Sequence, residues 1–269
     1  MSLYRPSELF AFLESIDARP KKSLSQNFLI DGNIIAKLTA SLPPGKPLVE
    51  IGPGPGSITE HLLAKGHPVT AIEKDHKLAT ALSRLPGDLT IRSDDILTTD
   101  LTDLPKPIHI VANLPFQITT PVLTRFVPLF PDIASLTLIV QKEVAERITG
   151  KEKSSLTCFI DFYASASYLF TISPNSFMPR PKVFAAAIQI CPRKPLSNDP
   201  ATYFMLVRTA FQARRKQLKS SLSCLYPKDR ITKALTELNL PETTRPEEIT
   251  AADFALLQSA LGPPGPSSP

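Results

Sequence analysis

Several common features are scarce or missing in this sequence of 269 residues. No apolar run approaches the roughly 20 residues that a membrane-spanning helix needs. The first residues lack the basic-then-apolar layout of a signal peptide and the acid-poor layout of a transit peptide. The three cysteines lie far apart and outside any CxxC pair, at Cys158, Cys191 and Cys224. This cysteine usage argues against a disulfide framework and a zinc site, so we expect a cytoplasmic protein without a metal or a membrane partner.

Positive charge is present but unevenly distributed. The formal net charge is +5. Between Arg193 and Arg230, nine lysines and arginines stand against two acids, Asp199 and Asp229, and the rest of the chain is close to neutral. Such segregation indicates a polyanionic partner, although a solvated basic face without a partner would have the same composition.

Seven apolar, β-prone runs follow one another along the first two thirds of the chain. Most are separated by segments with helical spacing, such as 58–63, 76–82 and 119–126, and this alternation is typical of an α/β fold with a mostly parallel sheet. A proline-rich loop without helical spacing joins the last two runs, so the final strand is expected to enter differently, as an antiparallel strand. The runs are 47–51, 68–72, 89–92, 108–112, 135–141, 167–172 and 184–190.

A change of composition at Pro192, Pro195 and Pro200 predicts a domain boundary. Residues 1–192 are expected to form the sheet domain, and residues 193–262 a small helical domain. Its helices are predicted at 203–211, 217–225, 230–238 and 251–261. The tail 263–269, with the sequence PPGPSSP, is expected to be disordered.

The strongest local signal is PLVEIGPGPGSITEHLLAKG, in which a strand ends in Gly52, Gly54 and Gly56. Glycines let the backbone turn sharply and approach a ligand, Ser57 can cap the next helix, and the helix N-terminus offers free N–H groups. A plain βα turn has the same pattern. The third glycine stands at 56 rather than 57, which mildly disfavours the GxGxxG dinucleotide form.

Two acids extend this site. Glu73 ends the second strand, 21 residues after Gly52, where an acid accepts hydrogen bonds from the ribose hydroxyls of an adenosine ligand. Asp95 ends the third strand and is placed to receive the amine of the adenine ring. The alternatives are a solvated strand end for Glu73 and a helix cap or turn for Asp95. The spacing leaves open whether the ligand is a dinucleotide or S-adenosylmethionine.

The sequence Asn113-Leu114-Pro115-Phe116 follows the fourth strand, at the sheet edge where open α/β sheets bind ligands. An Asn turn fixed by proline is the simplest interpretation. A chemical one is that the Asn113 oxygen and the carbonyl of Leu114 or Pro115 each accept one hydrogen of an adenine N6 amine, which directs the lone pair toward a methyl donor. Positioning would then supply most of the catalysis, without Cys, His or metal. Phe116 would stack on a flipped base. Phe177 could cover its other face or pack in the core.

Together these residues closely resemble the ribosomal RNA adenine-N6,N6 dimethyltransferases. The resemblance runs from about Leu24 to Leu261 and rests on motifs in family order: SLSQNFLID, VEIGPGPGSIT, AIEKD, SDDIL, NLPF, LIVQKEVAERI, FMPRPKV and AFQARRKQLKSSL. It implies a Rossmann-like class I methyltransferase fold, S-adenosylmethionine as methyl donor, and two adjacent adenines near the 3′ end of 16S rRNA in the small subunit as substrate. Coupling to small-subunit biogenesis is also implied.

The resemblance also assigns site residues. It implies donor contacts from Asn27 and Leu29, which no spacing would have selected, because QNFLID is otherwise a helix start capped by Asp31. It supports the same role for a set already identified: Gly52, Gly54, Glu73, Asp95 and Asn113. Two departures are visible, Phe116 where many members have Tyr, and Pro55 within the glycine loop. Neither removes a stacking face or a matching glycine.

Basic residues of the helical domain are candidates for contacts with RNA phosphates. Their spacing allows several on one helical flank, with Phe211, Leu218 and Leu222 available for the core. The candidates are Arg208, Arg214, Arg215, Lys216 and Lys219, and the next set, around the active-site mouth, is Lys21, Lys22, Arg180 and Lys182.

Three other functions remain alternatives. A large-subunit rRNA adenine methyltransferase of the antibiotic-resistance type shares the site motifs, but FMPRPKV and FQARRKQLKSSL are more similar to the small-subunit group. A non-catalytic ribosome-assembly or nucleic-acid-binding factor could lose Glu73, Asp95 or Asn113, and all three are present. A DNA adenine methyltransferase would need a larger domain for base readout. No feature calls for a dimer, so we expect a monomer.

Overall fold

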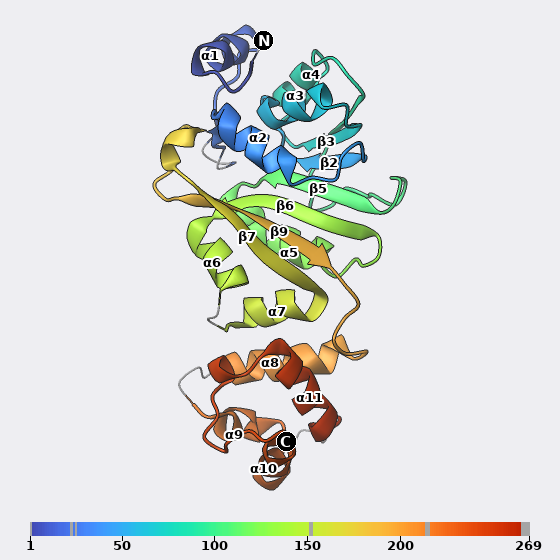
Figure 1. Cartoon of the computed structure of the whole chain (residues 1–269), viewed down its shortest axis with the longest axis vertical. Helices are drawn as coiled ribbons and strands as arrows, with labels where there is room; N and C mark the ends of the chain where they lie inside the picture. Colours follow the sequence, from blue (N-terminus) through green and yellow to red (C-terminus); the bar gives the residue numbers. More distant parts are fainter. Residues whose placement is uncertain (1, 22–23, 25, 151–152, 213–215, 265–269) are drawn as a thin grey trace. The chain divides into compact units, whose positions relative to one another are not determined.

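Two structural units make up the chain in the computed structural model, which describes residues 2–21, 24, 26–150, 153–212 and 216–264 (Figure 1). Unit 1 consists of Met1–Ala145 and Ser167–Pro192, and unit 2 consists of Glu146–Ala166 and Arg193–Pro269. Within the described ranges, no helix is long and apolar enough to cross a membrane.

Unit 1 contains the predicted seven-stranded sheet, with the strand order β4-β3-β2-β5-β6-β9-β7. The pairs β2–β3, β2–β5, β3–β4 and β5–β6 are parallel, and β9 is antiparallel to β6. Both the mostly parallel sheet and the antiparallel final strand are confirmed. The strands are β2 (Leu48–Ile51), β3 (Val69–Glu73), β4 (Leu89–Ser93), β5 (Ile108–Asn113), β6 (Ile133–Gln141), β7 (Ala164–Ile172) and β9 (Ala185–Pro192).

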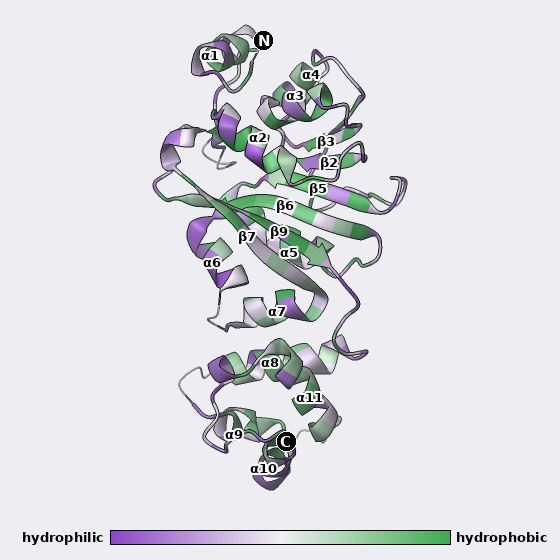
Figure 2. Ribbon diagram, viewed as in Figure 1, coloured by the Kyte–Doolittle hydropathy of each residue, from purple (hydrophilic) through white to green (hydrophobic). Residues whose placement is uncertain are grey.

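Burial along the strands follows their place in the sheet. Every residue of the inner strand β2 is buried, and β6 is buried from Ser135 to Val140. The edge strands β4 and β7 have exposed positions instead. Figure 2 shows hydrophobic residues along β5 and β6. Inner strands of a parallel sheet are covered on both faces, which is why they were visible as continuous apolar runs.

The helices of unit 1 begin close to where the sequence predicts. α4 (His76–Leu82) and α5 (Thr119–Phe126) have the predicted bounds, and α3 extends over Ser57–Ala64. Asp31 caps α2 (Gly32–Ala40), because its side chain accepts the N–H groups of Asn33 and Ile34 at 3.0 and 3.3 Å. Apolar residues of α2, α3 and α4 pack with those of β2 and β3 in one buried cluster.

Two features of unit 1 were not predicted. Helix α1 (Pro6–Ser15) packs Leu9, Phe12 and Leu13 in a cluster with Phe28. The two-residue strand β1 (Phe28–Leu29) pairs antiparallel with β8 (Phe177–Met178), so that Leu29 lies opposite Phe177. This short ladder brings the QNFLID and FMPRPKV motifs together.

Unit 2 is helical and begins earlier in the chain than expected. Besides α8 (Pro200–Gln212), α9 (Leu218–Ser221), α10 (Lys228–Glu237) and α11 (Ala251–Leu261), it contains α7 (Ser155–Tyr163). The boundary expected at residue 192 therefore matches the end of unit 1, but residues 146–166 join the helical unit. Where a helix was expected at 217–225, α9 is followed by a 3-10 turn over Leu222–Cys224.

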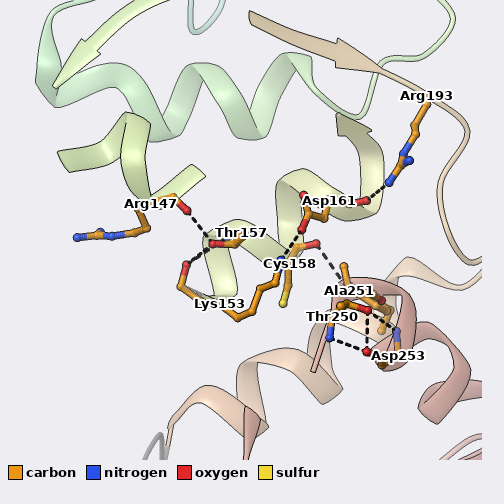
Figure 3. Close-up of polar contacts among 11 residues, drawn as sticks. Arg147, Lys153, Thr157, Cys158, Asp161, Arg193, Thr250, Ala251 and Asp253 are labelled. Atoms are coloured by element: carbon orange, nitrogen blue, oxygen red, sulfur yellow. Dashed lines mark hydrogen bonds and ion pairs between the residues drawn. The ribbon is translucent and has the colours of Figure 1, made fainter. Parts of the chain in front are cut away.

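Packing explains why α7 belongs with the C-terminal helices. Its residues Cys158 and Phe162 share a buried cluster with Tyr203. The Tyr203 hydroxyl lies 3.4 Å from the Cys158 carbonyl and 3.3 Å from the Ala251 carbonyl, and so joins α7 to α11. Figure 3 shows the polar contacts around α7, including the bond of 2.7 Å from Arg193 to the Asp161 carbonyl. Residues 265–269 of the predicted tail lie outside the described residues.

Candidate active site

A cavity of about 250 Å³ opens in unit 1 at the carboxyl ends of the parallel strands. Its walls come from the segment before β1, the turn after β2, the ends of β3 and β4, and the loop after β5. Most predicted site residues of unit 1 line this one cavity: Asn27, Gly52, Gly54, Glu73, Asp95, Asn113, Leu114, Pro115, Phe116 and Phe177. The structure thus brings together residues that are up to 150 positions apart.

Leu29 is the exception among the predicted donor-binding residues. It is 1% exposed, packs in the core and is not among the described residues that line the cavity. Its strand β1 instead holds the neighbouring Asn27 and Phe28 at the wall. The Leu29 side chain therefore packs in the core, one residue removed from the cavity wall, and its expected contact with the donor stays a prediction.

The glycine turn is shaped for a ligand. Gly52 has φ +62°, and a Cβ built on it would meet no atom within 4 Å, so the space beside the backbone is open. A Cβ on Gly54 would lie 3.0 Å from the Phe28 ring, which covers the turn. The predicted capping by Ser57 is wrong: Gly56, with φ +100°, is the N-cap of α3 and Ser57 is its first residue. Since Gly56 has no side chain, no side-chain cap occupies the N–H groups at the start of α3.

Glu73 is an acid of the cavity that two backbone N–H groups anchor. Its Oε2 accepts the Gly54 N–H at 2.9 Å and its Oε1 accepts the Asp75 N–H at 2.8 Å. Burial raises the pKa of the Glu73 carboxyl, and the two backbone N–H groups oppose that rise. Each oxygen has a second acceptor site. Glu73 therefore fixes the glycine turn and can still accept bonds from a ligand.

Asp95 forms an ion pair that the sequence did not indicate. Lys74 Nζ lies 2.8 Å from Asp95 Oδ2, and the Leu97 N–H donates to Asp95 Oδ1 at 2.9 Å. The hydrogen bond from Lys74 is the main reason why the pKa of Asp95 is lowered. Lys74 and Asp94 also line the cavity. Asp95 is therefore both a cavity acid and the turn residue that was its alternative interpretation.

Asn113 is held in one orientation by its amide nitrogen. Nδ2 donates to the Asn27 carbonyl at 2.8 Å, and no hydrogen bond to its Oδ1 occurs among the described residues. The Pro115 carbonyl accepts the Ile118 N–H at 3.0 Å, whereas the Leu114 carbonyl has no backbone donor in the described part of the chain. Of the two carbonyls considered for the amine, Leu114 is the better placed to accept a hydrogen.

Two aromatic rings contribute to the wall beside Asn113. Phe116, the first residue of the 3-10 turn η2 (Phe116–Ile118), is half-buried. Phe177 is 3% exposed and belongs to the core cluster, yet it also lines the cavity. Phe116 is thus the more accessible of the two rings, and Phe177 packs in the core at the cavity wall.

The basic residues of unit 2 do not share one helix. Arg208 lies on α8 and Lys219 on α9, with the exposed Lys216 in the bend between them. Lys219 Nζ pairs with Glu242 at 2.7 Å. Arg214 and Arg215 lie outside the described residues. The core positions are confirmed: Leu218 and Leu222 are fully buried, and the partly buried Phe211 packs against the same cluster.

Comparison with known proteins shows to which family the chain belongs. The model of the family "Ribosomal RNA adenine dimethylase" matches residues 18–261. The chain belongs to this family. The dimethylase is 42% identical over 260 residues to "Ribosomal RNA small subunit methyltransferase A" of Chlamydia muridarum, covering 92% of this chain and 94% of that one. It is accordingly an S-adenosylmethionine-dependent enzyme that dimethylates adenine in ribosomal RNA.

Two solved structures are similar to this dimethylase. The 23S rRNA methyltransferase ErmE superposes with a TM-score of 0.71 at 28% identity, covering 87% of this chain and 99% of that one. A dimethyladenosine transferase from Plasmodium falciparum has a TM-score of 0.76 at 22% identity, with coverages of 88% and 99%. The second likeness confirms the Rossmann-like fold with its helical C-terminal region.

The cavity of this dimethylase fits the adenosine part of S-adenosylmethionine. The open space beside Gly52 can take a ligand where a Cβ would intrude. Glu73 offers an anchored carboxylate, and Ile51, Ile72 and Ile96 supply apolar wall. When bound, S-adenosylmethionine supplies a methyl group on a sulfonium, which needs no further activation by an acid or a metal.

Proposed function

We propose that the dimethylase modifies N6 of two adjacent adenines in a loop near the 3′ end of small-subunit (16S) rRNA, coupled to small-subunit biogenesis. The observation that carries the proposal is the 42% identity, over 92% of the chain, to a relative named for the small subunit. Identity to the structurally similar 23S rRNA methyltransferase is 28%. Because the site chemistry suits an adenine amine in either subunit, whole-chain similarity is the observation that favours the small subunit as the substrate.

We propose the following roles around the cavity. Glu73 accepts hydrogen bonds from the ribose hydroxyls of the methyl donor, and Asp95 accepts one from its adenine amine. In the first methyl transfer, Asn113 Oδ1 and the Leu114 carbonyl each accept one N6–H of the target adenine; in the second, N6-methyladenine has a single N6–H left for one of them. Holding both hydrogens biases the nitrogen toward tetrahedral geometry and directs its lone pair at the donor. Phe116 stacks on the flipped base, a contact worth about 1–3 kcal/mol.

The hydrogen bond from Asn113 Nδ2 to the Asn27 carbonyl supports this assignment. An amide that donates through nitrogen presents its oxygen as the remaining acceptor. Neither Asn113 nor Leu114 has to be charged: the neutral N6 amine attacks the methyl group, S-adenosylhomocysteine leaves, and the proton then lost from N6 passes to solvent. Catalysis then comes from alignment, which can supply about 7–11 kcal/mol of a barrier in well-oriented reactions.

We propose that unit 2 contributes phosphate contacts through Arg214, Arg215 and Lys216, with a smaller contribution from Lys219, whose charge is shared with Glu242. Replacing Arg214, Arg215 and Lys216 with Ala should weaken subunit binding. It should also reduce the slope of log affinity against log salt by about 0.7–0.9 for each phosphate that is no longer neutralised. Affinity for the methyl donor is expected to stay unchanged. An unaltered salt slope would place the RNA surface elsewhere.

The substrate is tested directly with purified ribosomal subunits. The protein and methyl donor are incubated separately with unmethylated small and large subunits, and the modified nucleoside is identified by mass spectrometry. We expect dimethyladenosine in the small subunit alone. Dimethyladenosine in the large subunit alone would replace our substrate with the large-subunit one. We further propose that the protein acts in the cytoplasm. We also propose that it is a monomer, which light scattering would test.

A further inference from the structure

The loop between β8 and β9, residues 179–184, exposes apolar side chains next to cations. Phe184 is 52% exposed and Val183 is 43% exposed. Arg180 and Lys182, in the same loop, are also exposed. In the described part of the chain neither cation has an ion-pair partner. A single exposed ring is ordinary on a protein surface, but this loop combines a ring with two cations that form no ion pair with the described residues.

The loop begins and ends at the active-site edge of the sheet (Figure 1). It starts just after Phe177, which lines the cavity. At its other end, the Lys142 N–H donates to the Phe184 carbonyl at 2.9 Å, one step beyond the pair Gln141–Ala185. Asn113 is paired with Ile139 on the other side of the same strand β6.

These registers fix the distance between the two positions. Phe184 lies roughly 10 Å beyond the level of Asn113 along the strand direction and roughly 10 Å across, two strands away. This span is within reach of a nucleotide that flanks the one held at Asn113. It is too far for Phe184 to touch the target adenine ring held there.

We propose that Phe184 is a second stacking platform, which holds the RNA base next to the target adenine, while Arg180 and Lys182 contact the adjoining phosphates. A ring beside cations is the combination with which proteins hold single-stranded nucleic acid, because every base has a face that can stack. The inference deepens the proposed function, since it takes ribosomal RNA with neighbouring adenines as the substrate. It assigns Phe184 to RNA and not to the methyl donor.

Three substitutions at one position test the platform. Phe184→Ala and Phe184→Leu should each weaken binding to unmethylated small subunits about 5- to 100-fold, and Phe184→Trp should bind as the wild type does. Filter binding measures the affinity, and single-turnover methylation at subsaturating subunits should fall in parallel. Calorimetry with S-adenosylmethionine should give the wild-type affinity for all three variants.

Phe130→Ala is the matched control. Phe130 is 49% exposed and lies in unit 1, but it precedes β6 and is therefore at the opposite edge of the sheet. Its substitution should leave RNA binding unchanged, so that a general effect of removing an exposed ring is separated from stacking.

Each remaining outcome contradicts either the stacking role of Phe184 or the proposed small-subunit substrate, and the outcomes show which of the two has failed. Wild-type affinity in Phe184→Ala overturns the platform, and so does rescue by Phe184→Leu, because a merely apolar contact would tolerate leucine. Loss of donor affinity together with RNA affinity would make the loop a structural support instead. If the wild type methylates large subunits only, the proposed substrate fails, and the same variants assayed on large subunits still decide the platform.

Discussion

Glu50 offers the sharpest quantitative test of the site's electrostatics. It lies in β2, two residues before Gly52, and is 1% exposed. Its Oε2 has no hydrogen-bond partner among the described residues. Burial raises the pKa of Glu50 from 4.5 to about 8, the charge of Glu73 adds to the rise, and Thr59 offsets part of it. At neutral pH the Glu50 carboxyl is therefore mostly protonated.

The sign of the pH dependence follows from proton binding. The folded state holds the Glu50 proton more tightly than the unfolded state, so unfolding above pH 4.5 releases it. The associated stability is fully present below pH 4.5 and is lost as the pH rises toward about 8. A pKa difference of this size corresponds to roughly 5 kcal/mol in the free energy of unfolding.

Substitution of Glu50 by Gln removes this proton. The free energy of unfolding of Glu50→Gln minus that of the wild type should rise by several kcal/mol as the pH increases from about 5 to about 8. Urea denaturation followed by circular dichroism measures it, and Glu14→Gln, an exposed carboxyl of the same unit, is the control. Parallel stability curves for the wild type and Glu50→Gln would refute a protonated Glu50.

Further substitutions test the remaining parts of the cavity. Glu73→Ala should weaken binding of the methyl donor, because hydrogen bonds to a charged acceptor are worth about 1.5–3 kcal/mol each; calorimetry measures this, and unchanged affinity would reduce Glu73 to a strand-end charge. Asn113→Ala should lower single-turnover methyl transfer by orders of magnitude at saturating donor, and a near-normal rate would rule out its proposed role. Phe116→Tyr should be tolerated, whereas Phe116→Ala should lose about 1–3 kcal/mol of base stacking in RNA binding; equal affinities for both variants would contradict stacking. Gly52→Ala should cost about 1–2 kcal/mol of stability, because the φ of Gly52 is +62°, and it should also weaken donor binding. Thermal denaturation measures the first effect and calorimetry the second. Wild-type donor affinity would mean that the donor does not pass over Gly52.

The sheet could be predicted because its strands are buried on both faces. Such strands leave apolar runs that are visible without any knowledge of their partners, and α4 and α5 follow them with clear helical spacing. The pairing of β1 with β8 left no comparable signal. Two residues are too few for a periodic pattern, and the partners, Leu29 and Phe177, are far apart in the sequence. The place of residues 146–166 in unit 2 likewise depends on packing against Tyr203, which is not a local property.

The same distinction applies to the cavity. The glycine turn and Glu73 belong to one βαβ segment, so their spacing alone indicated that they would meet. Phe28 and Lys74 were missed because neither residue type suggests a ligand site by itself, and only the fold brings the Phe28 ring to Gly54 and Lys74 to Asp95. Ser57 was mistaken for a cap because the sequence could not show that Gly56 already turns into the helix with φ +100°.

The contact between Asn27 and Asn113 joins the QNFLID and NLPF motifs in the fold. The Asn27 carbonyl orients the Asn113 carboxamide at 2.8 Å, and Asn27 is held in place because β1, which follows it, pairs with β8. Phe177 of β8 in turn lines the same cavity. The segment that contains Asn27, which is expected to contact the methyl donor, therefore also orients the Asn113 amide, which is expected to align the target amine. We therefore expect a shift of β1 to disturb both donor binding and the alignment of the target amine.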